Sequence, residues 1–198
     1  MNFISTVARK RLMALAGLIW LGYVVSHSLS LFSFHLGQQV FNDFYHWFND
    51  SVIYWPMLLI LGATIALHIF TAITRQLSNN IAIGANKYHC SYPKIIPRFI
   101  AWSGAAILLI FIVFHFVQMQ LLSGSDPYQQ IVDIFTQPLM LVIYALGMLA
   151  LGMHLHHGLT NVLQTLGVSS RQYNLLAILI VLVVILGFVS IPVSIIYA

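Results

Sequence analysis

The sequence contains no glutamate, and its 198 residues include only four aspartates and eight lysines or arginines. Charged residues make up 6% of the chain and hydrophobic residues 60%, which gives a mean hydropathy of +0.92. A soluble domain needs a mixed, charged surface, and this composition does not supply one. The only cysteine, Cys90, excludes an intrachain disulfide and Cys-x-x-Cys chemistry. The scarcity of charge therefore indicates a membrane protein.

Long apolar runs stand between the few charges. A helix needs about 20 apolar residues to cross the hydrocarbon of a bilayer. Five stretches are long enough, at residues 12–34, 52–74, 99–122, 138–163 and 174–197. They are continuous rather than alternating, which disfavours barrel strands. We predict an all-α integral membrane protein, with a single domain over residues 1–198 and five transmembrane helices. The first four helices are expected to form a bundle, with the fifth peripheral to it.

The charges predict the topology of these helices. All eight basic residues fall on one side of the membrane and all four aspartates on the other. The positive-inside rule makes the basic side cytoplasmic and places the N-terminus there. Basic residues followed by an apolar run also begin a signal peptide. However, the first run is long, carries His27 and has no Ala-x-Ala site after it, so we expect it to be retained. A bacterial cytoplasmic membrane is the expected location.

Histidines are the titratable residues at membrane depth. The first three predicted helices each carry one, and the fourth carries a cluster: His27, His68, His115, and then His154, His156 and His157. A lone membrane histidine is usually explained by an interhelical hydrogen bond. Histidines on four helices at compatible depths indicate a shared function instead.

The depths of these histidines predict two pairs. At a rise of about 1.5 Å per residue, His27 and His115 lie about 24–25 Å from the basic ends of their helices. His68 and His154 lie only about 10–15 Å from the cytoplasmic ends of theirs. The spacing therefore gives an outer pair, His27 and His115, and an inner pair, His68 and His154.

Facing imidazoles between helices suit iron, because a helical bundle can hold a haem with one histidine on each face. Zinc would be under-coordinated by two histidines without further ligands. A proton relay usually includes carboxylates, which are missing from these helices. Small residues offer mild support for a macrocycle: Ala16, Gly104 and Gly147 share the faces of His27, His115 and His154, whereas Gly62 is out of phase with His68.

These segments resemble the membrane-anchoring cytochrome b subunit of succinate:quinone oxidoreductases, in its five-helix, two-haem form. The resemblance covers nearly the whole chain. It is carried by "VVSHSL", "LHIFTAI", "IAWSGAAILLIFIVFH" and "HLHHGL…QTLG", in that order. It implies two b-type haems, with His27 and His115 as ligands of the outer haem and His68 and His154 as ligands of the inner one.

The resemblance also implies partners and a substrate. A cytoplasmic flavoprotein subunit and an iron–sulfur subunit would hold the dicarboxylate site and pass electrons to the inner haem. Membrane quinone would be the second substrate, the lipid bilayer surrounds the chain, and no nucleic acid is expected. Some members that couple quinone chemistry to proton movement carry a glutamate where this chain has Gly152. The loop "GANKYHCSYPK" also departs from the Arg-Pro that the family tends to have there.

Further site residues follow from charge and position. The arginines at the cytoplasmic span ends, Arg11, Arg75 and Arg98, are candidates to bind the inner haem propionates. Insertion bias alone would also account for them. Near the outer haem, Asp50 is the candidate for quinone proton handling, with His46 and Tyr45 as weaker candidates; an N-cap role would equally explain Asp50.

Within the cluster on the fourth helix, we predict His154 as the ligand. His156 points about 160° away from His154, and His157 is offset by about 60° and lies one turn closer to the cytoplasm. The phase of Gly147 and the His-x-x-x-Gly spacing to Gly158 also favour His154.

Two other functions stay open at this point. The first is a cytochrome b subunit of another quinone-linked enzyme, such as a hydrogenase, formate dehydrogenase or nitrate reductase. The second, from a different class, is a small transporter or structural anchor whose histidines only join helices.

Overall fold

The computed structural model describes residues 6–82, 98–121, 124–168 and 170–197. Five helices in these ranges are long and apolar enough to span a membrane, which confirms the predicted number, and no strand is present in the same ranges. The spans are built from α1 (Thr6–Ser30) with the 3₁₀ segment η1 (Leu31–Leu36), α3 (Tyr54–Ala82), α4 (Arg98–Phe116) with the π-helical segment η2 (Val117–Leu121), α6 (Pro138–Thr165) and α7 (Arg171–Ile196).

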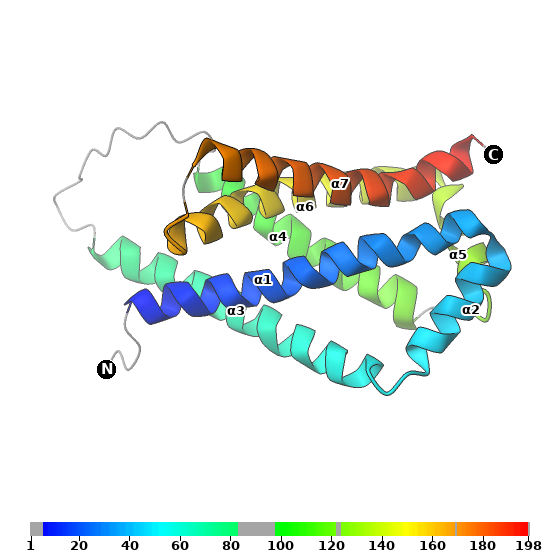
Figure 1. The fold of residues 1–198 in the computed structure, drawn as a ribbon, viewed down its shortest axis with the longest axis horizontal. Helices are drawn as coiled ribbons and strands as arrows, with labels where there is room; N and C mark the ends of the chain where they lie inside the picture. Colours follow the sequence, from blue (N-terminus) through cyan, green and yellow to red (C-terminus); the bar gives the residue numbers. More distant parts are fainter. Residues whose placement is uncertain (1–5, 83–97, 122–123, 169, 198) are drawn as a thin grey trace.

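The spans pack as two helix pairs, which are joined by direct packing of α1 against α6 and by the last helix. α1 packs against α3, and α4 packs against α6. α7 lies against both α6 and α1, so it links the two pairs (Figure 1). The hydroxyl of Ser28 in α1 donates to the carbonyl of Val184 in α7 at 3.3 Å. The sequence analysis expected the fifth span to be peripheral to the other four, and an apolar sequence without histidine did not reveal that it packs against α1 and α6.

Two short helices that the sequence analysis did not identify lie at one end of the bundle. They are α2 (Gln38–Asn49) and α5 (Pro127–Phe135), and they pack against each other. Both are amphipathic and too short to span a bilayer. Their apolar faces join a buried cluster with the outer ends of α6, α7 and η1: Phe34, Phe41, Ile131, Ile134, Phe135, Tyr144 and Ile191.

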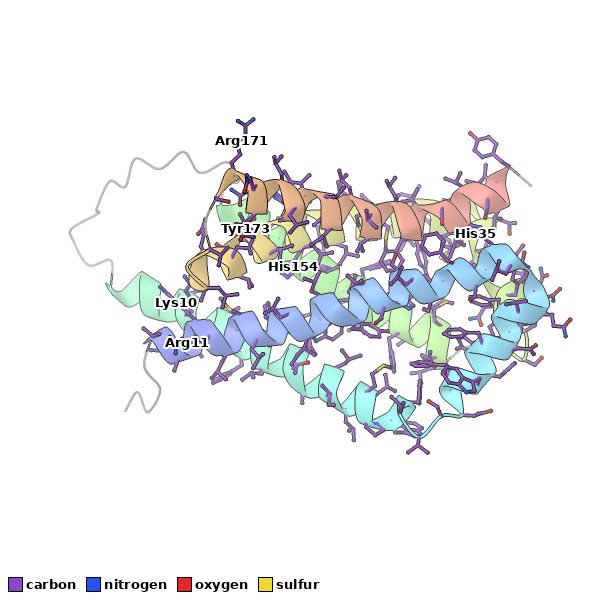
Figure 2. The ribbon with its side chains drawn as sticks, in the orientation of Figure 1. Lys10, Arg11, His35, His154, Arg171 and Tyr173 are labelled. Atoms are coloured by element: carbon purple, nitrogen blue, oxygen red, sulfur yellow. The ribbon has the colours of Figure 1, made fainter. Side chains whose placement is uncertain are left out.

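Charge is separated between the two ends of the molecule. Figure 2 places Lys10, Arg11 and Arg171 at the end where α1 and α7 begin. The helices α2 and α5 lie at the opposite end, near the C-terminus (Figure 1). The four aspartates belong to α2, α5 and the residues that flank them. The lysines of the loop between α3 and α4, Lys87 and Lys94, and Cys90 lie outside the described residues.

Asp126 connects the two short helices. It is the N-cap of α5, where its carboxylate accepts the backbone N–H of Gln129 at 3.0 Å. The same carboxylate accepts hydrogen bonds from the amides of Gln38 and Asn42 in α2. The N–H of Gln129 contributes most to holding the pKa of Asp126 below its ordinary value, followed by the amide of Asn42. One carboxylate thus caps α5 and fixes α2 against it.

We expect Asp126→Ala to lower the apparent melting temperature of the detergent-solubilised protein, because α5 loses its cap and α2 loses its anchor. The lowered pKa means that this stabilisation is complete above the ordinary value of 3.8 and is lost as the pH falls through the lower folded value. The difference in melting temperature between wild type and variant should therefore be constant near neutral pH and become smaller in acid. The matched control is Asp43→Ala, at an exposed position of α2. Equal destabilisation by both variants would contradict the role of Asp126.

Candidate functional site

Four of the membrane-depth histidines lie in two facing pairs. The ring centroids of His27 in α1 and His115 in α4 are 6.1 Å apart. Those of His68 in α3 and His154 in α6 are also 6.1 Å apart. Each histidine pair therefore takes one residue from α1 or α3 and the other from α4 or α6. The structure thus brings together the residues that the depth argument had paired.

The spacing within each pair suits a metal between the rings. An imidazole nitrogen binds a metal ion at about 2 Å, so two imidazoles on opposite sides of one ion have centroids about 6 Å apart. Metal sites made only of side chains usually need three or four ligands. Within the described residues, no group of three or more His, Cys, Asp or Glu side chains is placed to hold a metal. Two histidines suit an iron whose other ligands come from a macrocycle.

The inner pair has a fixed proton position on one ring. Nδ1 of His68 lies 3.3 Å from the backbone carbonyl oxygen of Met13. A carbonyl only accepts, so Nδ1 carries the proton and donates it. Nε2 then keeps its lone pair, and this is the tautomer that a metal-binding histidine uses.

The outer pair has a similar arrangement made by side chains. Nδ1 of His115 lies 3.2 Å from the hydroxyl of Tyr144, and that hydroxyl lies 2.8 Å from Oε1 of Gln118. The amide nitrogen of Gln118 faces the sulfur of Met140 at 3.7 Å, which fixes the orientation of the amide. Tyr144 therefore donates to Gln118 and accepts from Nδ1 of His115. Nε2 of His115 is left with its lone pair.

Aromatic side chains hold the outer rings in place. The ring of Tyr23 is parallel to that of His27, with ring centroids 5.6 Å apart. The ring centroid of Phe188 in α7 also lies 5.6 Å from that of His27. Phe111 stacks on His115 at 5.9 Å. These contacts restrict the orientation of both imidazoles, and one of them comes from the helix that was expected to be peripheral.

A cavity of about 1890 Å³ connects the two pairs. All four paired histidines line it, together with residues of α1, α3, α4 and α6. Small-molecule sites usually occupy about 300–1,000 Å³, so the space between the helix pairs exceeds that of one ordinary ligand. It extends from Arg11 and Arg75 at one end to Tyr45 and Tyr54 at the other.

One buried donor in the cavity wall has no partner. The indole nitrogen of Trp20 is buried without a hydrogen bond among the described residues. Buried polar groups are nearly always paired. The indole N–H of Trp20 and the two histidine pairs therefore favour an occupant that carries both a hydrogen-bond acceptor and a metal.

The three clustered histidines of α6 differ in position. His154 lines the cavity and its ring faces that of His68. Figure 2 shows His154 inside the bundle. His156 is exposed and does not line the cavity. His157 reaches the cavity wall, but it is exposed and its Nε2 lies 2.9 Å from the amide nitrogen of Asn161. Of these three histidines, His154 alone faces a second imidazole in the described part of the chain.

The small residues of the cavity differ from those expected. Ala16, Gly104 and Gly147 do not line the cavity, whereas Gly17 and Gly62 do. A Cβ added to Gly17 would lie 3.7 Å from the His68 ring. The expectation for the first three residues is corrected, because the helices cross and the face that meets the cavity changes along each helix.

The arginines proposed for the propionates and the aspartate proposed for proton handling differ in their position relative to the cavity. Arg11 and Arg75 are exposed and line the cavity at its basic end, while the side chain of Arg98 lies outside the described residues. Asp50 is exposed in the turn after α2 and does not line the cavity. It is the C-cap of α2 and lies four residues before α3 begins at Tyr54, so the N-cap explanation is wrong.

Sequence reasoning missed Tyr54 and Gln120 at the outer end of the cavity, and it named Tyr45 there only as a weaker candidate. The hydroxyl of Tyr54 donates to Oε1 of Gln120 at 2.9 Å, and that of Tyr45 donates to the carbonyl of Met119 at 3.2 Å. Gln120 and Met119 belong to the π-helical segment η2, a feature that is frequent at functional sites. Nothing in the apolar pattern of residues 103–121 signals this change of helix type.

Comparisons with protein-family models, curated proteins and solved structures gave no match for this chain. Its fold and site therefore rest on its own residues and geometry.

Gly147 provides a test of the packing behind the outer pair. A Cβ at this position would lie 2.6 Å from ring atoms of Phe111, which stacks on His115. We expect Gly147→Ala to destabilise the protein by about 1–3 kcal/mol, as overpacking does in other cores. Thermal unfolding in detergent measures the effect. Gly62→Ala is the control, since a Cβ there meets nothing within 4 Å. Equal melting temperatures for wild type and Gly147→Ala would contradict the tight contact.

Proposed function

We propose that this chain is the membrane-anchoring cytochrome b subunit of a succinate:quinone oxidoreductase. In this proposal it carries electrons between a cytoplasmic iron–sulfur subunit and membrane quinone, and a flavoprotein subunit holds the dicarboxylate site. The proposal joins the resemblance of four histidine-bearing segments to the geometry of the site.

The observation that carries the proposal is the presence of two histidine pairs with the same spacing. Both pairs have ring centroids 6.1 Å apart, and both line one cavity between two helix pairs. A structural anchor that used histidines only to join helices would gain nothing from a metal-compatible spacing repeated at two depths. A b-type haem bound at each pair would supply one-electron transfer.

The residues of the chain have separate tasks in this proposal. Nε2 of His68 and of His115 is available for iron, because Met13 and Tyr144 accept the proton on the other nitrogen. His154 and His27 supply the opposite ligands. Arg11 and Arg75, which line the basic end of the cavity, are proposed to donate to propionates, and Arg98 is proposed for the same task from its position in the sequence.

Quinone reduction is proposed at the outer end, which electrons reach last when they enter from the basic side. Each quinone takes two electrons and two protons, so this end needs a proton donor. Asp50 remains the predicted proton-handling residue; it is exposed and follows in sequence Asn49, which lines the cavity. Tyr45 is the competing candidate, because its side chain is in the cavity wall.

A reduced-minus-oxidised spectrum of the purified complex tests the haem content. We expect two b-type haems per chain, with a flavin-containing subunit copurifying. Absence of haem would refute the proposal. Two haems with a different catalytic subunit would place the chain in another quinone-linked enzyme.

Single alanine substitutions test the ligand assignment on α6. We expect His154→Ala to retain one haem per chain, because His68 loses the imidazole that faces it. His156→Ala and His157→Ala serve as matched controls and should retain two, since neither imidazole faces another histidine ring. The measurement is the pyridine haemochrome content per chain. Loss of a haem in His157→Ala, with both retained in His154→Ala, would reverse the assignment.

Asp50→Asn and Tyr45→Phe distinguish the two proton-handling candidates. We expect Asp50→Asn to lower the rate of quinone reduction by about a hundredfold or more, the lower end of a general acid's contribution. The haem content should stay unchanged, and Asp43→Asn on the same helix should behave as wild type. If Asp50→Asn retains the full rate while Tyr45→Phe loses it, the proton-handling role belongs to Tyr45.

A further inference from the structure

Tyr144 occupies a position between the outer histidine pair and the end of the bundle. It lies in α6, is 9% exposed and lines the cavity. Its ring is edge-on to Phe111 at 5.3 Å, to His115 at 5.8 Å and to Phe135 at 4.9 Å. Side chains from α4 and α5 thus fix the phenol, and its hydroxyl has little freedom to turn to another partner.

The hydroxyl of Tyr144 is the middle member of a polar chain. Nδ1 of His115 donates to it, and it donates to Oε1 of Gln118. The backbone carbonyl of Gln118 accepts the side-chain amide of Gln130 at 2.9 Å, which attaches this segment to α5. Gln118 lies in the π-helical segment η2, so α4 changes its helix type where it contributes to this chain.

Among the described residues, no side chain takes this role at the inner pair. Nδ1 of His68 donates to a backbone carbonyl, that of Met13, which no substitution removes. A carbonyl is also a stronger acceptor than a phenol oxygen. The two pairs therefore differ in a feature that tunes bound metals, since hydrogen bonds to a ligand change its basicity and the potential of the metal.

We propose that Tyr144 is a positioning residue for the outer haem: it fixes the tautomer of His115 and lowers the midpoint potential of the iron that His115 binds. The inference rests on the proposed function, because it needs a haem at the outer pair. A hydrogen bond accepted from Nδ1–H makes the imidazole a better donor to iron and favours the oxidised metal. Donation from Tyr144 to Gln118 strengthens its acceptor oxygen through cooperativity.

Tyr144→Phe tests the proposal by redox titration of the purified complex. The phenylalanine keeps the ring and removes the acceptor. We expect two haems per chain, with one midpoint potential raised and the other unchanged. Gln118→Leu should raise the same potential by a smaller amount. Tyr23→Phe is the matched control: its ring stacks on His27, and in the described structure its hydroxyl makes no hydrogen bond to a histidine ring.

The outcomes separate this inference from the proposed function. A wild-type complex without haem refutes both. Two haems with unchanged midpoint potentials in Tyr144→Phe overturn the role of Tyr144 and leave the proposed function in place. If Tyr144→Phe fails to retain the outer haem, Gln118→Leu decides: a raised potential of one haem supports the inference, and unchanged potentials overturn it. Equal shifts in Tyr23→Phe and Tyr144→Phe would also overturn it, because loss of any nearby hydroxyl would then suffice.

Discussion

An imidazole inside a membrane is costly unless its ring nitrogens are paired, and the arrangement of the spans pairs one ring nitrogen of His68 and one of His115. Polar groups in hydrocarbon are costly when unpaired. His68 and His115 each direct one nitrogen to an acceptor and face a second imidazole across the cavity. The α1–α3 and α4–α6 helix pairs are held at the separation that lets these rings face each other.

The rest of the fold maintains that separation. α7 packs against α1 and α6 and contributes Phe188 to the surroundings of His27. At the other end, α2 and α5 close the bundle over an apolar cluster, and Asp126 fixes one short helix to the other. Residues of α2, α5 and α7 also line the cavity, so these elements form part of its wall.

The two histidine pairs have the same ring spacing but different hydrogen-bond partners. A backbone carbonyl serves His68, whereas a tyrosine and a glutamine serve His115. The outer pair also has more aromatic contacts, from Tyr23, Phe111 and Phe188. Under the proposed function, this unequal hydrogen bonding would give the two bound metals different potentials.

The sequence by itself determined the five spans and the depth of each histidine, because hydropathy and the rise per residue depend only on the local chain. It therefore predicted which imidazoles face each other. Tertiary structure decided which small residues line the cavity, since helix crossing turns Gly17 and Gly62 inward in place of Ala16 and Gly104. It also placed α7 against His27, removed Asp50 from the cavity wall and set Tyr144 beside His115. Such contacts join residues far apart in the chain, and apolar patterning carries no signal for the partner that a given side chain meets.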